Sequence, residues 1–204
     1  MHFNVQLIVG LGNPGAQYER TRHNAGFWLL DELAHRANVS FKPDKRHQAE
    51  CATARIGESS VTLMKPLTFM NASGAAVASY ANYFRIPVHE LLIVHDELDL
   101  SPGTVRLKRG GGHGGHNGLR DIVAQLGAEF SRLRIGIGHP GVASAVLNYV
   151  LGVPSSTDRD AIAEALARAC AVMPQITMGQ FDRVMNLLNR RTDVPPAAGG
   201  NAQE

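Results

Sequence analysis

The segment VRLKRGGGHGGHNGLRD at residues 105–121 combines features that suit the binding of an anion or a carbonyl group. Its glycines expose backbone N–H groups, and a helical pattern after Asn117 would place the positive end of a helix dipole beside them. Arg106 and Lys108 alternate with apolar residues, so on a β-strand they would share one face about 7 Å apart. That separation is on the order of the spacing between successive phosphates of a nucleic acid. The segment predicts an anion site, with exposed charges on an edge strand as the purely structural alternative.

His23 is the candidate for acid–base chemistry. It directly precedes a predicted helix, is flanked by Arg22 and Asn24, and lies near the turn GNPG. A histidine with a carboxylate partner is the usual general base for activating water. Asp96, at the end of the apolar strand LLIVH, would be a partly buried carboxylate that can orient the imidazole. A lone histidine is more often a surface or core residue, so this hypothesis depends on the motifs around it.

Two other kinds of site compete with this interpretation. His113 and His116 form H-x-x-H near the acidic residues of 96–99, but the glycines around them give no rigid helical face and no H-E-x-x-H pattern is present. GLGNPG at 10–15 fits the dinucleotide fingerprint G-x-G-x-x-G. The residues after it do not open an amphipathic helix, and the acidic residue expected after a second strand is missing. A tight turn that needs positive φ explains these glycines better.

Short β-branched runs alternate with helical patterns along the chain. The predicted strands lie at 5–9, 50–56, 61–65, 91–95, 104–108 and 133–138. One helix is predicted after Asn24, its N-cap, a second after Asn71 or Ser73, and a third after Asn117, ending at Gly127. A last pair is predicted at 157–173 and 179–190, with Pro174 and Gly179 at the break between them. This alternation predicts an α/β fold, a single domain over 1–191 with a twisted, mixed and largely parallel β-sheet flanked by helices. The tail at 192–204 is predicted to be disordered.

Polar or glycine-rich segments follow four of the predicted strands. GNPG follows 5–9, PLTFMN follows 61–65, HDELD follows 91–95 and RGGGHGGHN follows 104–108. Ligands of open α/β sheets sit outside the carboxyl ends of the strands. If the four strands are neighbours, we expect these segments to converge on one site.

Composition limits the class of protein and its partners. With 204 residues, 44% of them hydrophobic and 19% charged, the chain is long enough to bury a full core and is neither disordered nor embedded in a membrane. It has no apolar run of ~20 residues, and its start lacks the basic region of a signal peptide, so we expect a cytoplasmic protein. Cys51 and Cys170 suggest reduced, buried thiols. Although the net charge is only +2, residues 101–134 carry six basic and two acidic side chains, which indicates an anionic partner.

Five segments resemble the bacterial peptidyl-tRNA hydrolases in order, spacing and identity. They are GLGNPGAQYERTRHNAG at 10–26, KPLTFMNASGAAV at 65–77, HDELDLSPGTVRLKRGGGHGGHNGLRD at 95–121, RLRIGIGHPG at 132–141 and NYVLG at 148–152. The resemblance covers nearly the whole chain. It implies a monomeric α/β enzyme that needs no metal or cofactor and cleaves the ester between a peptide's carboxyl end and the terminal ribose of tRNA. Such an enzyme recycles tRNA from peptidyl-tRNA dropped by ribosomes.

The same resemblance assigns catalytic roles to single residues. His23 would be the general base that activates water, and Asp96 would hold it in the right tautomer. Asn13 and Asn71 would border the reacting ester, while Asn117 would hydrogen-bond the peptide main chain and position the water. The chemistry is consistent, because ester hydrolysis passes through an oxyanion for which amide side chains are suitable donors.

Binding roles follow in the same way. Met70 would shape the pocket beside the ester, Tyr18 would help to bind the acceptor end, and His116 would belong to the substrate site. Lys108 and Arg134 would clamp a tRNA phosphate, with Arg106 as a helper. Fixed cations of this kind supply affinity with little sequence preference.

Three rival functions remain to be weighed. An RNA-binding protein on this fold without hydrolysis would be favoured by loss of His23 or Asp96, but both are present. A metallohydrolase that uses His113 and His116 would be inactivated by a chelator. A protein that binds NAD through residues 10–15 would show fluorescence quenching by the cofactor.

Overall fold

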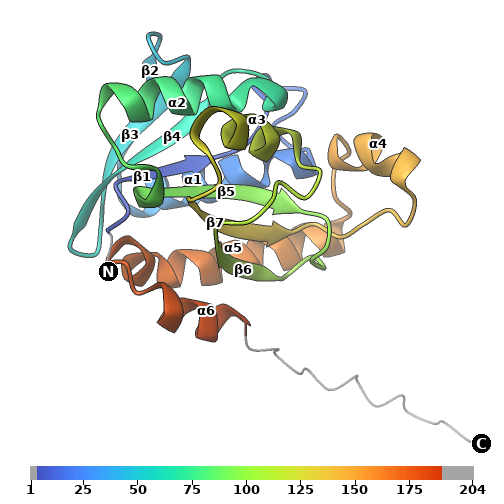
Figure 1. Ribbon diagram of the computed structural model, residues 1–204. Coiled ribbons are helices and arrows are strands. Elements are labelled where there is room, and N and C mark those ends of the chain that lie inside the picture. The colour runs from blue at the N-terminus through green and yellow to red at the C-terminus, as the bar shows by residue number, and fades with distance from the viewer. Residues whose placement is uncertain (1–3, 190–204) are drawn as a thin grey trace, which may run out of the picture.

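The chain folds around one twisted sheet with helices on both faces (Figure 1). The computed structural model describes residues 4–189. The strands are β1 (Leu7–Gly10), β2 (Lys42–Asp44), β3 (Ala49–Ile56), β4 (Ser59–Pro66), β5 (Leu91–Glu97), β6 (Val105–Arg109) and β7 (Ser131–Gly136). Their order is β2-β3-β4-β1-β5-β7-β6, in which β4, β1, β5 and β7 run parallel and the other pairs antiparallel. The predicted fold class is confirmed.

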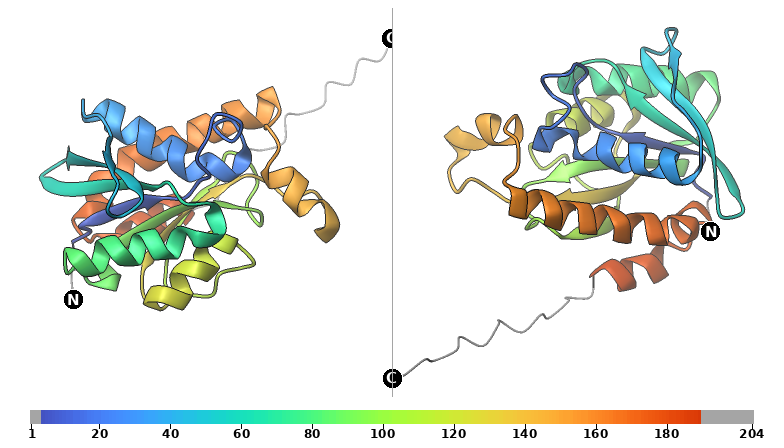
Figure 2. Two further views of the ribbon diagram at one scale, coloured as in Figure 1. Left: turned by 90° about the horizontal axis from the view of Figure 1, so that it is seen from above. Right: turned by 180° about the vertical axis from the view of Figure 1, so that it is seen from behind.

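Two layers of helices cover the sheet. The helices are α1 (Ala25–Arg36), α2 (Ser73–Tyr83), α3 (Asn117–Leu126), α4 (Val146–Val150), α5 (Ser156–Thr177) and α6 (Phe181–Asn189). Helices α1 and α5 cover one face and α2 and α3 the other, while α4 stands out at one end of the molecule (Figure 2). None of the helices between residues 4 and 189 has the length and apolar character that crossing a membrane requires.

The central strands separate two apolar cores. In β1, Ile8 packs into the core under α1 and α5, whereas Leu7 and Val9 pack into the core under α2 and α3. Strand β5 divides its side chains in the same way, and all four residues of β1 are buried. Burial on both faces explains why these strands are continuous apolar runs rather than alternating ones.

Glycines allow α1 to pack unusually close to the sheet. A Cβ on Gly26 would lie 2.5 Å from the backbone nitrogen of Leu11 and 2.5 Å from the carbonyl oxygen of Val94, and one on Gly10 would lie 2.5 Å from the Gly26 oxygen. Only Gly15 of the segment GLGNPG has a positive φ, at 106°. The prediction of a tight turn therefore holds for Gly15, whereas Gly10 makes room for the helix.

Several predicted boundaries were wrong. Helix α5 continues through Pro174, because the carbonyl of this proline still accepts from the backbone nitrogen of Met178, and the break comes at Gly179 with φ 74°. The side chain of Asn24 does not cap α1. Strand β2 and helix α4 were not predicted; β2 has three residues including Pro43, and α4 has five.

Other expectations have mixed outcomes. Gly127 does end α3, with φ 79°. Both cysteines are free, but Cys51 is only half-buried while Cys170 is buried. The tail expected at 192–204 lies outside the described residues, so the boundary at 191 stays a prediction.

We expect Gly26→Ala to lower the free energy of unfolding by about 3 kcal/mol, because three backbone atoms would lie within 2.6 Å of the new methyl group. The matched control is Gly112→Ala, whose Cβ would have no neighbour within 4 Å and which should change stability by less than ~0.5 kcal/mol. Urea unfolding of both variants measures the difference. Equal losses in the two variants would contradict the close approach of α1.

Candidate functional site

A cleft at the carboxyl edge of the sheet contains the predicted catalytic pair. It has a volume of about 300 Å³ and lies between the start of α1, the end of β5, the glycine loop at 110–116 and α4. His23, Asp96, His113, His116 and Asn117 are among its lining residues. The apolar side chains of Leu98, Val146, Leu147 and Val150 form another part of its wall.

Three of the four predicted strands end at this edge and the fourth ends at the opposite one, although the segment after it also reaches the cleft. β1, β4 and β5 are parallel neighbours, so the segments after them meet. β6 is antiparallel to β7, so it ends at the opposite edge, where Gly110 bonds to Phe130. The glycine loop must then cross the face of the sheet to bring His116 back to Asp96.

Asp96 binds two imidazoles. The His23 Nδ1 lies 3.0 Å from both carboxylate oxygens of Asp96, and the His116 Nε2 lies 2.9 Å from Oδ1. The second nitrogen of His116 accepts from the backbone N–H of Leu119, so in the neutral ring Nε2 carries the proton and donates to Asp96. An ionised carboxylate can only accept, so the neutral ring of His23 donates from Nδ1, which leaves its Nε2 as a free base.

Burial and charge together set the protonation of this group. Burial opposes the charged form of His23, but the charge of Asp96 and its hydrogen bond outweigh this, so the pKa of His23 is raised above its usual 6.5. Burial also opposes the charged form of Asp96 and by itself would raise the pKa of this carboxyl group. The neighbouring His23 and His116 instead hold that pKa well below its usual range. Asp96 therefore stays an anion although it is only 3% exposed.

His95 is a second buried imidazole, on the other side of His116. Its ring meets the His116 ring edge-on at 5.0 Å, and its Nδ1 donates to the Asp96 carbonyl at 2.7 Å. Burial, with the neighbouring His116, lowers the pKa of His95 to about 3. His95 is therefore a neutral packing partner of the site, which the sequence reasoning did not identify.

Asn13 is held rigidly by its neighbours. Its side-chain oxygen accepts from the backbone N–H of Met70 at 2.8 Å. The amide of Asn24 accepts from the Asn13 N–H at 2.8 Å and donates to the Asn13 carbonyl at 3.0 Å. This network uses the acceptor of the Asn13 side chain and leaves its NH₂ group as a donor. Asn24, predicted as a helix cap, instead positions Asn13.

The remaining predicted residues lie around the cleft and not all within it. Asn117 begins α3, and its side-chain oxygen accepts from Arg120 at 3.0 Å. Asn71 is exposed, while Met70 is buried, and neither lines the cavity that contains His23. His116, and not Asn117, caps α3.

Tyr18 also lies outside that cavity and contacts a residue that was missed. Its ring meets the ring of Phe69 edge-on, with 6.4 Å between the centroids. Phe69 directly precedes Met70 and is 59% exposed. A large exposed aromatic beside an asparagine is a signal that the segment PLTFMN already contained.

The basic side chains of residues 101–134 do not form one continuous surface. Lys108 and Arg134 line a pocket of about 150 Å³ under the glycine loop, where Arg134 also pairs with Glu97 at 2.9 Å. Arg132 is only 2% exposed and donates to the carbonyls of Gly111 and Gly112, so it anchors the loop rather than a surface ligand. Arg106 donates to the Leu188 carbonyl at the end of α6 at 2.7 Å.

The structure does not favour the two alternative sites, a metal site with His113 and a dinucleotide site at residues 10–15. Within residues 4–189, the side chains grouped closely enough to hold a metal ion are His23, Asp96 and His116, so His113 is not one of them. His113 instead accepts from the backbone N–H of Gly115. The facing nitrogens of His23 and His116 carry protons in the tautomers above, which suits a hydrogen-bonded triad better than a set of metal ligands. After GLGNPG the chain runs through turns before α1 begins at Ala25, so the turn lacks the helix of a dinucleotide site.

Comparisons with known proteins agree on one family. The model of the family described as peptidyl-tRNA hydrolase matches residues 7–196. A peptidyl-tRNA hydrolase of Alkalilimnicola ehrlichii is 51% identical over 92% of this chain and 96% of its own, and one of Legionella pneumophila is 54% identical over 91% and 98%. The crystal structure of peptidyl-tRNA hydrolase from Acinetobacter baumannii superposes with a TM-score of 0.90 at 44% identity, covering 93% of this chain and 97% of that one.

We expect NMR titration to place the pKa of His23 above 6.5 in the wild type and below 6.5 in Asp96→Asn. The substitution removes the negative charge but keeps the burial, which by itself lowers the pKa of an imidazole. His95 should show no titration between about pH 5 and 8 in either protein. A His23 pKa that does not change in Asp96→Asn would show that the carboxylate does not control the imidazole.

Proposed function

The chain belongs to the peptidyl-tRNA hydrolase family, whose members hydrolyse the ester bond of peptidyl-tRNA, and we propose that His23 is its general base. The observation that carries the proposal is the contact of both Asp96 oxygens with Nδ1 of His23 at 3.0 Å. That contact leaves Nε2 unprotonated in a cleft with room for substrate.

The reaction follows from this geometry. Nε2 of His23 takes a proton from water as the water oxygen attacks the ester carbonyl, and Asp96 stabilises the imidazolium that forms. The carbonyl oxygen becomes an oxyanion, for which the free NH₂ group of Asn13 is a suitable donor. When the carbon–oxygen bond to the ribose breaks, the imidazolium returns its proton to the leaving ribose oxygen. The products are tRNA and a peptide carboxylic acid, which loses its proton to water and leaves as the carboxylate.

His116 acts through Asp96. Its bond to Oδ1 takes one lone pair of the carboxylate and fixes its plane, while its ring contacts the His23 ring at 5.0 Å. Because His116 also lines the cleft, it can meet the substrate directly. We therefore assign it to both positioning and the substrate site.

Different residues would bind the peptide and the acceptor end of the tRNA. Asn117 lines the cleft and offers an amide to the peptide main chain. Asn71, exposed and next to Met70 in the chain, offers another. Tyr18 and the exposed Phe69 present aromatic surface on which bases of the acceptor end can stack.

Lys108 and Arg134 form the proposed phosphate clamp. They line one pocket under the glycine loop, next to the cleft. Lys108 is exposed and Arg134 is half-buried, so both can meet a phosphate from solvent. Arg106 is a weaker candidate as a helper, because its guanidinium already donates to the Leu188 carbonyl.

We further propose that the enzyme works as a cytoplasmic monomer without a metal ion. One chain supplies every residue of the site, its substrate is a product of translation, and the facing nitrogens of His23 and His116 are used in contacts with Asp96. The domain proposed over residues 1–191 contains all these residues.

His23→Ala should reduce kcat for release of tRNA from N-acetyl-aminoacyl-tRNA by at least ~10³-fold, because the proton acceptor is removed. His35→Ala, on the exposed face of α1, is the control and should keep full activity. EDTA should leave the wild-type rate unchanged. Activity that persists in His23→Ala, or that disappears with EDTA, would contradict the proposed chemistry.

Lys108→Ala should raise KM roughly tenfold with little change in kcat, because it removes a charged contact to phosphate and no reacting group. It should also reduce the steepness with which binding weakens as salt is added. The matched control is Lys45→Ala, an exposed lysine of the β2–β3 turn. If both lysine variants behave alike, Lys108 does not belong to a specific clamp.

A further inference from the structure

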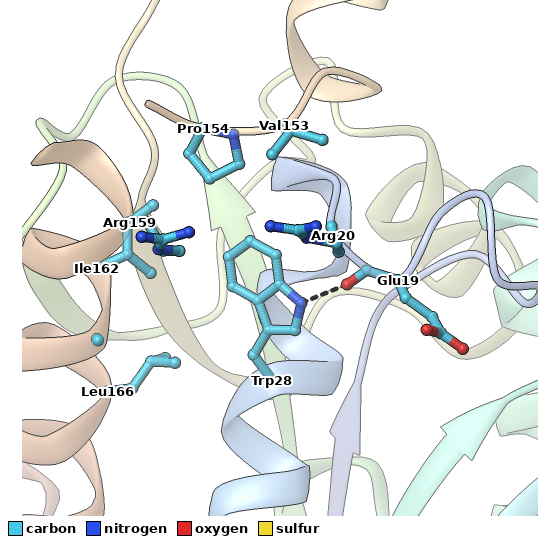
Figure 3. A pocket seen from close by; sticks show the side chains of 9 residues that line it. Glu19, Arg20, Trp28, Val153, Pro154, Arg159, Ile162 and Leu166 are labelled. Carbon is cyan, nitrogen blue, oxygen red and sulfur yellow. Dashed lines mark hydrogen bonds between the residues drawn. The ribbon is translucent and has the colours of Figure 1, made fainter. Parts of the chain in front are cut away.

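A second cavity, the Trp28 pocket, lies between α1 and α5 (Figure 3). It shares no lining residue with the catalytic cleft. Its volume is about 280 Å³, and Trp28, Ile162, Leu166, Pro154, Arg20 and Arg159 are among its lining residues. It is on the α1 and α5 side of the sheet. Lys108 and Arg134 alternate with the residues of β6 and β7 that pack toward α1 and α5, so they lie on the other face.

The floor of the Trp28 pocket is apolar. Ile162 and Leu166 are buried side chains of α5, and the Trp28 ring stands between α5 and the loop at 15–21 (Figure 3). The indole N–H donates to the Glu19 carbonyl at 2.7 Å. Because its polar group is already used, the indole can offer a ligand only its ring surface, which favours another flat ring.

Two guanidinium groups flank this floor (Figure 3). Arg20 makes no hydrogen bond or ion pair with any residue of the described range 4–189. Arg159 approaches Asp160 at 3.8 Å, but both side chains are more than half exposed, so this contact is weak. Both arginines are therefore available to an anion, and their planar donor groups match phosphate well.

We propose that the Trp28 pocket binds a nucleotide, with the base stacked on Trp28 and the phosphate held by Arg20 and Arg159. An apolar floor, a ring surface and two free guanidinium groups suit a flat ring that carries an anion. The volume is near the lower end of the ~300–1,000 Å³ range of ligand pockets, which suits one nucleotide whose phosphate stays at the mouth. The site is distinct from the hydrolytic one and does not depend on His23.

The nucleotide could be free or part of tRNA. The turn at 15–21, in which Tyr18 bonds to Gly15 and Thr21 to Tyr18, carries both Tyr18 on the substrate side and Arg20 at the Trp28 pocket. A nucleotide of bound tRNA could therefore reach over this turn. Lys108 and Arg134, the proposed tRNA clamp, lie on the other face of the sheet from the Trp28 pocket, which favours a free nucleotide. Titration with AMP and with tRNA can separate the two sources.

The experiment uses Trp28 itself, which is the single tryptophan of the chain. Its fluorescence is measured while AMP, adenosine or deacylated tRNA is added to the full-length protein. We expect saturable quenching by a nucleotide, because a stacked base contacts the indole, and binding at least tenfold weaker in Arg20→Gln and in Arg159→Gln. Arg55→Gln, an exposed arginine of β3 outside the pocket, is the matched control and should bind as the wild type does.

Each outcome decides the proposal. Quenching by AMP but not by tRNA supports a free nucleotide, whereas stronger quenching by tRNA supports a nucleotide of the substrate, provided that both arginine variants weaken it. The absence of saturable quenching by either, quenching that persists in both arginine variants, or adenosine that binds as tightly as AMP would overturn it. The Trp28 pocket shares no lining residue with the cleft that contains His23 and Asp96, so failure here would leave the proposed function untouched.

Discussion

The site depends on one buried charge, the carboxylate of Asp96. An isolated anion at this depth would be strongly disfavoured, so it requires partners that donate hydrogen bonds. His23 and His116 supply them, at 3.0 and 2.9 Å. The same contacts fix the tautomer of His23, raise its pKa and hold the glycine loop against β5. Removing the carboxylate would therefore affect base strength, ring orientation and loop position together.

The fold can meet this requirement because its backbone segments approach closely. Gly26 lets α1 begin against the backbone of Leu11 and Val94, which places His23 directly above the end of β5. A Cβ on Gly118 would lie 2.6 Å from the sulfur of Met70, so the glycine lets the Met70 side chain pack against the start of α3. Arg132 holds the loop between β6 and α3 by its carbonyls. Glycines and one buried arginine thus bring distant segments to Asp96.

The sequence could predict elements and chemical groups better than contacts. Apolar runs predicted the central strands, and motif identity predicted the pairing of His23 with Asp96, because both depend on local residue types. The pairing of His116 with Asp96 was not predicted, since nothing local shows that β6 runs antiparallel and that the loop crosses the sheet. Arg132 had the pattern of a surface cation and is buried. Asn24 has the residue type of a helix cap, but a tertiary contact with Asn13 uses its side chain.

The most direct test of the central claim is the pH dependence of kcat/KM for the wild type and for Asp96→Asn. A general base works only when unprotonated, so activity should fall as pH drops through the His23 pKa, which Asp96 raises above 6.5. The account predicts a wild-type inflection above 6.5 and, in the variant, a lower maximum with its inflection at lower pH. An inflection at the same pH in both proteins would show that the essential base is not an imidazole controlled by Asp96.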